Sequence, residues 1–322
     1  MSITLFVLRR LCGGLVLLLV LALLVFALLD ASPGTPLQTL LGTRPVTPEL
    51  MADLRGRYHL DEPFAARFLH WLAGAVRLDF GQSISVQSGT PVADMIYGRM
   101  LLTTELAVYC LLLVLLVGVP LGVAAGMRHG RATDRGISLL ATVGFGAPVH
   151  VLSVVLLYVF GVALGWFPVY GAGEDGLADR ITHLTLPAVT LAIVLSAVVV
   201  RQTRAATLTV VRQDYLTFAR LRGLSPGRVL IRYVLRNSAP PVVTSAGMLL
   251  IAPVGAGIFI EQVFSLPGMG SLLLSAVTAK DVPVVQGLAL LLGAFVVVVN
   301  LVVDLLGYLL DPRVRLHAAG EG

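Results

Sequence analysis

The chain has 322 residues, of which 57% are hydrophobic and only 13% charged, and its mean hydropathy is +0.91. This composition excludes a soluble globular domain, whose surface would need many more charged residues, and makes the lipid bilayer the main solvent of the protein. The two cysteines, Cys12 and Cys110, both lie in apolar runs, which excludes a disulfide framework. The formal net charge of +5 comes from arginine, because Lys280 is the only lysine among 23 lysines and arginines.

Six uncharged runs are long enough to cross a bilayer. The first covers residues 11–29 behind Arg9 and Arg10, and its 19 residues would form a helix of about 28 Å, close to the ~30 Å thickness of the hydrocarbon. It is too long for the apolar core of a signal peptide. We therefore predict an all-α polytopic membrane protein with six spans, whose termini lie on the same side. The other five runs are residues 106–127, 137–164, 184–200, 238–260 and 282–303.

Arginine is unevenly distributed over the loops between these runs. Residues 127–136 carry three arginines against one acid, and residues 201–236 carry eight arginines against one acid. In residues 165–183 the acids outnumber the single arginine, and residues 265–281 contain one base and one acid. Short cytoplasmic loops are the ones enriched in arginine and lysine. The pattern predicts cytoplasmic positions for the first two loops and for both termini.

The segment between the first two spans is expected to be external and to contain two short helices. Thr47-Pro48-Glu49 has the order of a helix start, with a capping hydroxyl, a proline in the first turn and an early acid. Phe64, Phe68, Trp71 and Leu72 recur at helical spacing, which predicts a second helix packed on the spans. The predicted organisation is a tail and first span at 1–30, an external segment at 31–100, a five-span core at 101–310 with a loop at 201–237, and a cytoplasmic tail at 311–322.

Glycines and prolines recur within the predicted spans. Gly118, Gly122 and Gly126 follow one another at intervals of four, which would let another helix approach closely along one face. Prolines release backbone carbonyls that must find other partners, so we expect kinks where they interrupt the runs. These prolines are Pro120, Pro148, Pro187 and Pro253.

A few polar side chains lie in or at the ends of the spans, where a carboxylate near the bilayer centre costs about 2 to 3.5 kcal/mol. Such side chains are expected to face protein or a water-filled path. Two roles are open: a structural one, in which they cap a helix or link two helices, and contact with a transported solute. We favour the structural role. The candidates for the path are Glu105, Glu261, Asn300 and Asp304.

Gly223-Leu224-Ser225-Pro226-Gly227 matches the G-x-S-x-G pattern of serine hydrolases. In a nucleophile elbow the residue after the serine donates its backbone N–H to the oxyanion, but Pro226 has no N–H. The residues before the serine also lack the alternation of a strand. The only lysine precedes Asp281 rather than a serine or threonine, so the chain has no nucleotide-binding P-loop, and it has neither an HExxH nor a CxxC motif. We therefore predict no catalytic residue, no metal ligand and no enzymatic activity.

The same five residues suit a turn between two helices. Gly223 favours the left-handed conformation that ends a helix, Ser225 is a good N-cap, and Pro226 fits the first helical position. Burying the eight arginines of residues 201–236 in lipid would cost on the order of 20 kcal/mol, so the helix pair must project into the cytoplasm. The second helix carries an arginine stripe at every fourth residue, formed by Arg228, Arg232 and Arg236.

Three interpretations of this basic helix pair remain: contact with lipid headgroups, recognition of DNA, or docking of a cytoplasmic partner. DNA recognition is disfavoured because six spans would tether the DNA-binding helices to a membrane, and we expect no nucleic acid partner. Docking is attractive because a transporter without a P-loop needs a mechanical connection to a protein that has one. A self-sufficient channel or secondary carrier stays open as the alternative, motivated by the acids and prolines in the spans.

Short motifs along nearly the whole chain resemble one family. The loop contains Asp214-Tyr215, Ala219-Arg220, Gly223-Leu224, Arg236-Asn237 and Pro241. Further motifs are Ser32-Pro33-Gly34, His183-Leu184, Leu186-Pro187, VFSLPGMG at 263–270, PVVQG at 283–287 and Asp311-Pro312-Arg313. Together they resemble the permease subunits of binding-protein-dependent ABC importers of the dipeptide, oligopeptide and nickel class, whose signature loop is called the EAA motif. The departures from the family pattern are Phe218, Leu221, Arg222 and Tyr233.

The resemblance implies a type I ABC importer permease fold and a prokaryotic cytoplasmic (inner) membrane. The chain would form half of a translocation path for peptides or similar small solutes. The implied partners are a second homologous permease, two cytoplasmic ATPase subunits that bind ATP and magnesium, and an extracytoplasmic substrate-binding protein; no cofactor is implied in this chain. Residues around 271–279, together with Met269, would lie near the mouth of the path as a gate. The loop would be a coupling helix that docks an ATPase through Tyr215, Ala219, Arg220, Gly223, Leu224, Ser225 and Arg228.

Overall fold

The structure is a computed structural model that describes residues 3–31, 56 and 62–310. Over these residues the chain is helical, and the only β pairing is an isolated bridge between Gln82 and Pro91, which confirms the all-α class. The helices are α1 (Ile3–Asp30), α4 (Phe64–Val76), α5 (Val92–Met127), α6 (Ala132–Gly146), α7 (Val149–Leu156), η1 (Leu157–Ala163), α8 (Leu177–Val211), α9 (Asp214–Leu221), α10 (Pro226–Val229), η2 (Leu230–Leu235), α11 (Arg236–Met248), α12 (Ala252–Val263), α13 (Met269–Thr278) and α14 (Val282–Leu310). Elements η1 and η2 are π-helices.

The chain forms two compact units. Unit 1 comprises Met1–Val7, Thr104–Leu266 and Val299–Gly322, and unit 2 comprises Leu8–Thr103 and Pro267–Val298. Three long helices, α1, α5 and α14, therefore belong partly to one unit and partly to the other.

Fewer than six of the described helices are long and apolar enough to cross a membrane alone. By length and composition, α1, α5, α8 and α14 can each cross a membrane, and α6 with α7–η1 forms a pair bent by 101° that counts as a fifth span at most. The run predicted at 238–260 consists of α11 and α12, with 13 and 12 residues, each too short to cross alone. By length and composition alone, the described residues thus contain four segments, or five with the bent pair, that can each cross, and a sixth crossing would be made by α11 and α12 together.

The break between α11 and α12 has a local cause. The backbone N–H groups from Leu249 to Ala252 all bond to the carbonyl three residues earlier, at 3.1 to 3.2 Å, instead of four residues earlier. Pro253 follows at the start of α12, and a proline both lacks an N–H and disfavours the α conformation of the residue before it. Pro148 similarly precedes α7 at the bend after α6, whereas Pro120 and Pro187 lie inside continuous helices.

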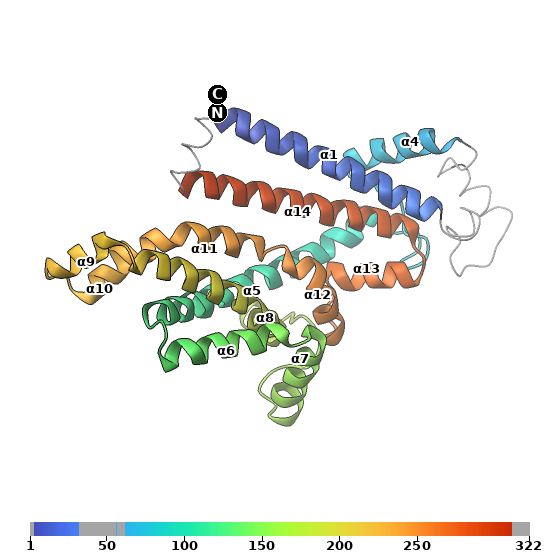
Figure 1. The fold of residues 1–322 in the computed structure, drawn as a ribbon. Coiled ribbons are helices and arrows are strands. Elements are labelled where there is room, and N and C mark those ends of the chain that lie inside the picture. The colour runs from blue at the N-terminus through green and yellow to red at the C-terminus, as the bar shows by residue number, and fades with distance from the viewer. Residues whose placement is uncertain (1–2, 32–55, 57–61, 311–322) are drawn as a thin grey trace. The chain divides into compact units, whose positions relative to one another are not determined.

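In unit 1, α8 contributes buried side chains from Leu184 to Val210, and α6 and α11 pack along it (Figure 1). The glycine pattern of α5 also faces α8. A Cβ atom added at Gly122 would lie 2.5 Å from the Cβ of Thr203, and one at Gly126 would lie 2.7 Å from the Cβ of Thr207. No larger residue fits these positions without separating the helices, so the predicted close approach is confirmed. We call this contact the α5–α8 seam.

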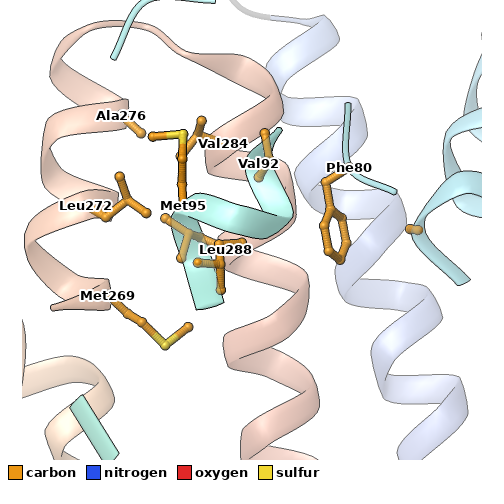
Figure 2. Close-up of a cluster of buried hydrophobic side chains, with 10 residues drawn as sticks. Phe80, Val92, Met95, Met269, Leu272, Ala276, Val284 and Leu288 are labelled. Atoms are coloured by element: carbon orange, nitrogen blue, oxygen red, sulfur yellow. The ribbon is translucent and has the colours of Figure 1, made fainter. Parts of the chain in front are cut away.

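Unit 2 is built around an apolar cluster that joins α5, α13 and α14. Figure 2 shows Met95 of α5 between Leu272 of α13 and Leu288 of α14, and all three side chains are buried. Elsewhere in this unit α4 packs on α1, where the ring of Phe26 lies 5.4 Å from that of Phe64 between centroids. The predicted packing of this short helix on a span is therefore confirmed, whereas the helix start predicted at residues 47–49 lies outside the described residues.

Candidate functional site

The α9–η2 segment, Asp214–Leu235, lies at one end of α8 and α11 (Figure 1). Helix α9 ends in a tight turn, in which the N–H of Arg222 donates to the carbonyl of Phe218 at 3.0 Å and that of Leu224 donates to the carbonyl of Ala219 at 3.4 Å. Gly223 closes the turn with φ +75°, a conformation that residues with a Cβ rarely adopt. The left-handed conformation predicted for this glycine is confirmed.

Ser225 and Pro226 begin the next helix as predicted, at the N-cap and in the first turn. The side chain of Ser225 makes no capping hydrogen bond with the described residues, so the expectation that its hydroxyl caps the helix is wrong. Ser225 is exposed, and water can occupy the place of that bond. Helices α9 and α10 flank this serine, and no strand precedes it among the described residues, which is incompatible with a nucleophile elbow.

A small apolar core fixes the α9–η2 segment to the end of α8. Val210 of α8, Leu216 of α9, Val229 of α10 and Val234 of η2 are buried against one another, and Tyr233 packs on this cluster. A further link that the sequence did not indicate comes from α11. The Asn237 side-chain amide donates to the hydroxyl of Tyr215 at 3.3 Å and to the carbonyl of Tyr233 at 2.8 Å. The segment is therefore attached to α8 and α11 through side chains as well as through the backbone.

The outer surface of the segment combines large apolar side chains with arginines. Phe218 is 65% exposed and Leu221 is 77% exposed, and Ile231 is exposed too. The arginines at 228, 232 and 236 are also exposed. Because Arg232 lies within the π-helix η2, the three do not form the regular α-helical stripe that their spacing predicted. Exposed aromatic and aliphatic side chains next to cations are typical of a protein contact surface.

The seven residues predicted to dock a partner fall into two groups. Four of them are exposed and available to a partner: Tyr215, Gly223, Ser225 and Arg228. Ala219 is buried and Leu224 is half-buried against the small core, so these two support the surface. Arg220 lies in α9, and its side chain is outside the described part of the chain.

A buried carboxylate that the sequence did not single out lies near the same end of α8. Asp134, in the first turn of α6, is 3% exposed and receives two hydrogen bonds from Arg204 of α8, from Nε at 2.6 Å and from Nη2 at 2.9 Å. The N–H of Gly130 donates to it at 2.9 Å, and Nδ1 of His129 lies 3.2 Å from it. In the sequence this aspartate stands only as the single acid in an arginine-rich loop.

The polar residues predicted in the spans come from three helices, α5, α12 and α14. Glu105 of α5 accepts a hydrogen bond from Arg180 of α8 at 2.7 Å, which is the link between two helices that the structural interpretation expects. Glu261 of α12 is buried, and Asn300 and Asp304 of α14 are partly buried. A cavity of about 370 Å³ between α5, α6 and α8 is lined by apolar side chains and one serine, and none of these four residues lines it.

Met269, the fifth candidate for the path, belongs to unit 2. It is buried at the start of α13, and its N–H donates to the hydroxyl of Thr103 in α5 at 2.9 Å. Helix α13 itself is amphipathic, with Leu272 buried in the cluster of Figure 2 and Leu274 and Val277 exposed. The helix predicted around 271–279 is thus present and packed on α5 and α14.

A second buried carboxylate holds the turn between α13 and α14. A single oxygen of Asp281, Oδ2, accepts hydrogen bonds from the hydroxyl of Ser83 at 2.6 Å and from the N–H groups of Ile84, Ser85 and Val86 at 3.1, 2.9 and 3.0 Å. The other oxygen, Oδ1, is buried without a partner among the described residues. Three successive N–H groups directed at one carboxylate form an anion nest, which ties residues 83–86 to the start of α14.

Comparison with known proteins agrees with this architecture. Residues 118–316 match the family described as binding-protein-dependent transport system inner membrane component, and residues 3–107 match the family of its N-terminal part. The chain is 33% identical to a probable peptide ABC transporter permease protein of Sinorhizobium fredii, with 96% of this chain and 99% of the relative covered. It is 34% identical to the oligopeptide transport system permease protein AppB of Bacillus subtilis, covering 96% and 99%, and 35% identical to the dipeptide transport system permease protein DppB of Escherichia coli K12, covering 96% and 98%.

Among solved structures, the MetNI methionine ABC transporter in an inward-facing conformation shares the fold, with a TM-score of 0.55 and 17% identity over 67% of this chain and 96% of that chain. The type I importer fold that the sequence resemblance implied is thereby confirmed. The family match covers most of the chain, and relatives more than 30% identical span nearly all of it. The chain belongs to the family of inner-membrane components of binding-protein-dependent transport systems and is a permease subunit of an ABC importer.

Proposed function

We propose that this permease imports peptides and that a cytoplasmic ATPase docks on the exposed face of its α9–η2 segment. The proposal of peptides rests on the relatives, since proteins named as peptide, oligopeptide and dipeptide permeases are 33%, 34% and 35% identical over 96% of the chain. The chemical identity of the peptides is set largely by the partner that delivers them.

The observation that carries the docking proposal is the exposure of Phe218 and Leu221 on a segment that is otherwise firmly packed. A segment exposed only to water would be expected to place these side chains inward, where Leu216 and Val229 lie. An apolar face held in one conformation by a core behind it costs little ordering entropy on binding. Arg228 adds positive charge beside this face, which favours a partner whose cleft is acidic at its rim.

The remaining features of the transporter follow from this docking. The arginine-rich loops and both termini face the cytoplasm, the α13 side faces outward, and ATP and magnesium bind to the partner ATPases. A second homologous permease completes the path, and an external binding protein delivers the solute. Glu261, Asn300 and Asp304 remain candidates for the path wall, and α13 with Met269 for its outer gate.

The docking proposal is tested by replacing the two exposed apolar residues with aspartate, Phe218→Asp and Leu221→Asp, in a tagged permease expressed with its partner subunits. Because the charges would be buried against the ATPase without partners, we expect the amount of ATPase retained on purification to fall by at least about tenfold. The melting temperature of the permease in detergent should stay unchanged, because neither side chain is buried in the chain itself.

The matched control is Leu177→Asp. Leu177 is as exposed as Leu221, at 77%, but lies at the opposite end of α8. It should leave ATPase retention unaltered. Equal retention by the Leu221→Asp and Leu177→Asp proteins would contradict docking at this face.

Peptide transport is measured in the same preparation, reconstituted in liposomes with its binding protein, as uptake of radiolabelled peptides from a tryptic digest of casein. Uptake should require all subunits and ATP. Uptake of the same magnitude by the purified single chain would instead support a self-sufficient carrier and overturn the proposal.

A further inference from the structure

The carboxylate of Asp134 joins three parts of unit 1. It belongs to α6, it is bonded to the turn before α6 by the N–H of Gly130, and it is bonded to α8 by two nitrogens of Arg204. The Arg204 Nη2 also lies 3.1 Å from Nδ1 of His129 in the same turn. A guanidinium that holds both oxygens of a carboxylate fixes the orientation of the two groups as well as their separation. We call this arrangement the Asp134–Arg204 clamp.

The end of α5 meets the same turn of α8. A Cβ atom added at Gly126 would lie 2.7 Å from the Cβ of Thr207 and 3.0 Å from the backbone carbonyl oxygen of Arg204. The two helices are therefore in backbone contact at the residue that carries the clamp. At this level α8 cannot rotate or slide without displacing α5 sterically and α6 through the ion pair.

The clamp lies close to the α9–η2 segment along the chain. Arg204 precedes the end of α8 at Val211 by seven residues, which is about 10 Å of helix. Between them Val210 packs in the small core with Leu216 and Val229. The continuous helix α8 thus connects the small core behind Phe218 and Leu221 with the clamp, and the clamp connects α8 with α6.

We propose that Asp134 and Arg204 are positioning residues that transmit movement of the docked α9–η2 segment to the membrane helices α5 and α6. The inference rests on the proposed docking of an ATPase at this segment. When the ATPase displaces the segment, α8 moves with it through the small core, and the clamp makes α6 follow. Without the ion pair α8 would shift against α6, and the cycle of the ATPase would proceed with a smaller movement of the path.

A structural role alone does not account for the choice of residues. An ion pair with a buried carboxylate, such as Asp134 with the partly exposed Arg204, contributes little net stability compared with well-packed apolar side chains, because the carboxylate loses its hydration. Its particular property is geometric, since a bidentate pair fixes the orientation of the two groups as well as their separation. The prediction therefore concerns the ratio of transport to ATP hydrolysis rather than stability.

The test uses the complete complex in liposomes and compares Asp134→Asn, Arg204→Lys and the two combined. Asparagine keeps an acceptor for Gly130 but removes the charge, and lysine keeps the charge but removes the second bond. We expect peptide uptake per ATP hydrolysed to fall by about fivefold in Asp134→Asn and by less in Arg204→Lys, with ATP hydrolysis itself retained. The combined variant should resemble Asp134→Asn, because both changes remove one interaction.

Arg135→Gln is the matched control. Arg135 is the next residue of the same turn, and it is exposed and takes no part in the clamp. Its loss changes the net charge of the loop by one unit and should leave the ratio unchanged. A second readout, the stimulation of ATP hydrolysis by the binding protein, should fall with the ratio in the clamp variants and not in the control.

The inference is overturned if the clamp variants take up as much peptide per ATP hydrolysed as the Arg135→Gln protein does, or if their uptake and ATP hydrolysis decline in equal proportion. If Asp134→Asn reduces the amount of assembled complex, the uptake per ATP hydrolysed by the Arg204→Lys protein is the deciding measurement, because this variant retains a paired charge. Failure of the proposed docking looks different: the Phe218→Asp and Leu221→Asp proteins would then retain as much ATPase on purification as the unmodified permease.

Discussion

Among the described residues, each of the two compact units buries one aspartate, and the hydrogen-bond partners of the two carboxylates differ in kind. Asp134 in unit 1 is 3% exposed and meets the charged side chain of Arg204, which comes from a helix 70 residues further along the chain. Asp281 in unit 2 is completely buried and meets a hydroxyl and three backbone N–H groups of residues 83–86. One carboxylate thus joins two helices by their side chains, and the other fixes the backbone of a loop.

The difference bears on what each aspartate can do. The backbone N–H groups that point at Asp281 cannot reach another acceptor unless the backbone itself changes conformation. Asp281 therefore maintains the local fold. A long arginine side chain can instead swing to water or to another acceptor when its partner leaves. We therefore expect loss of Asp281 to appear in stability, and loss of Asp134 to appear in the coupling of movement.

The largest effect is expected for Asp281→Ala. The change leaves three N–H groups and the hydroxyl of Ser83 without their acceptor in a buried to partly buried site, at a cost of about 3 kcal/mol. The melting temperature of the purified permease in detergent should fall, and residues 83–86 should exchange their amide hydrogens faster.

Asp281→Asn serves as the comparison. Its amide oxygen can take the four hydrogen bonds of Oδ2, and its NH₂ replaces Oδ1, which has no partner among the described residues. This variant should lose less stability than Asp281→Ala. Equal melting temperatures for the unmodified and Asp281→Ala proteins would remove the contrast drawn between the two aspartates.

A smaller effect is expected at the α5–α8 seam, for Gly122→Ala. The new methyl group would lie 2.5 Å from the Cβ of Thr203 and 2.8 Å from the backbone carbonyl of Val200, and a backbone carbonyl within a helix cannot turn away. Overpacking of this kind costs about 2 kcal/mol. The melting temperature should fall, whereas Gly98→Ala on the same helix, where the new atom meets no other part of the chain within 4 Å, should not lower it. A similar decrease in both proteins would show that glycine itself, and not the seam, matters.

Local sequence patterns predicted much of this architecture. The spacing of Gly118, Gly122 and Gly126 predicted a close helix contact, and the Gly223 to Gly227 pattern predicted the turn between α9 and α10. Both are properties of neighbouring residues on one element, and they are fixed by helix periodicity and by backbone preferences. The break before Pro253 also had a local signal, because the proline predicted a kink there, although the uniform hydropathy of residues 238–260 did not show that the run divides into two helices.

The two buried aspartates could not be predicted in the same way. Asp134 and Arg204 are separated by 70 residues, and Asp281 and Ser83 by 198. No periodicity links such pairs, and in the sequence each acid looks like an isolated loop charge. Ser225 shows a different limit, since the sequence pattern predicted its position at the helix start but not the rotamer of its side chain, which makes no capping hydrogen bond with the described residues. Pairing across the fold depends on how helices pack, which one sequence does not specify.

The smallest effect, of opposite sign, is expected for Thr203→Val within the seam. The hydroxyl of Thr203 is buried and has no partner among the described residues, so a valine of the same shape removes an unsatisfied polar group and should stabilise the protein by about 0.5 to 1 kcal/mol. Thr190 is the matched residue on α8, because it is equally buried but donates its hydroxyl to the carbonyl of Leu186 at 2.7 Å. Thr190→Val should therefore lower the melting temperature in detergent while Thr203→Val raises it. A decrease in both proteins would mean that the hydroxyl of Thr203 has a partner in the assembled helices, and that the seam, like the Asp134–Arg204 clamp, is held by polar contacts and not by shape alone.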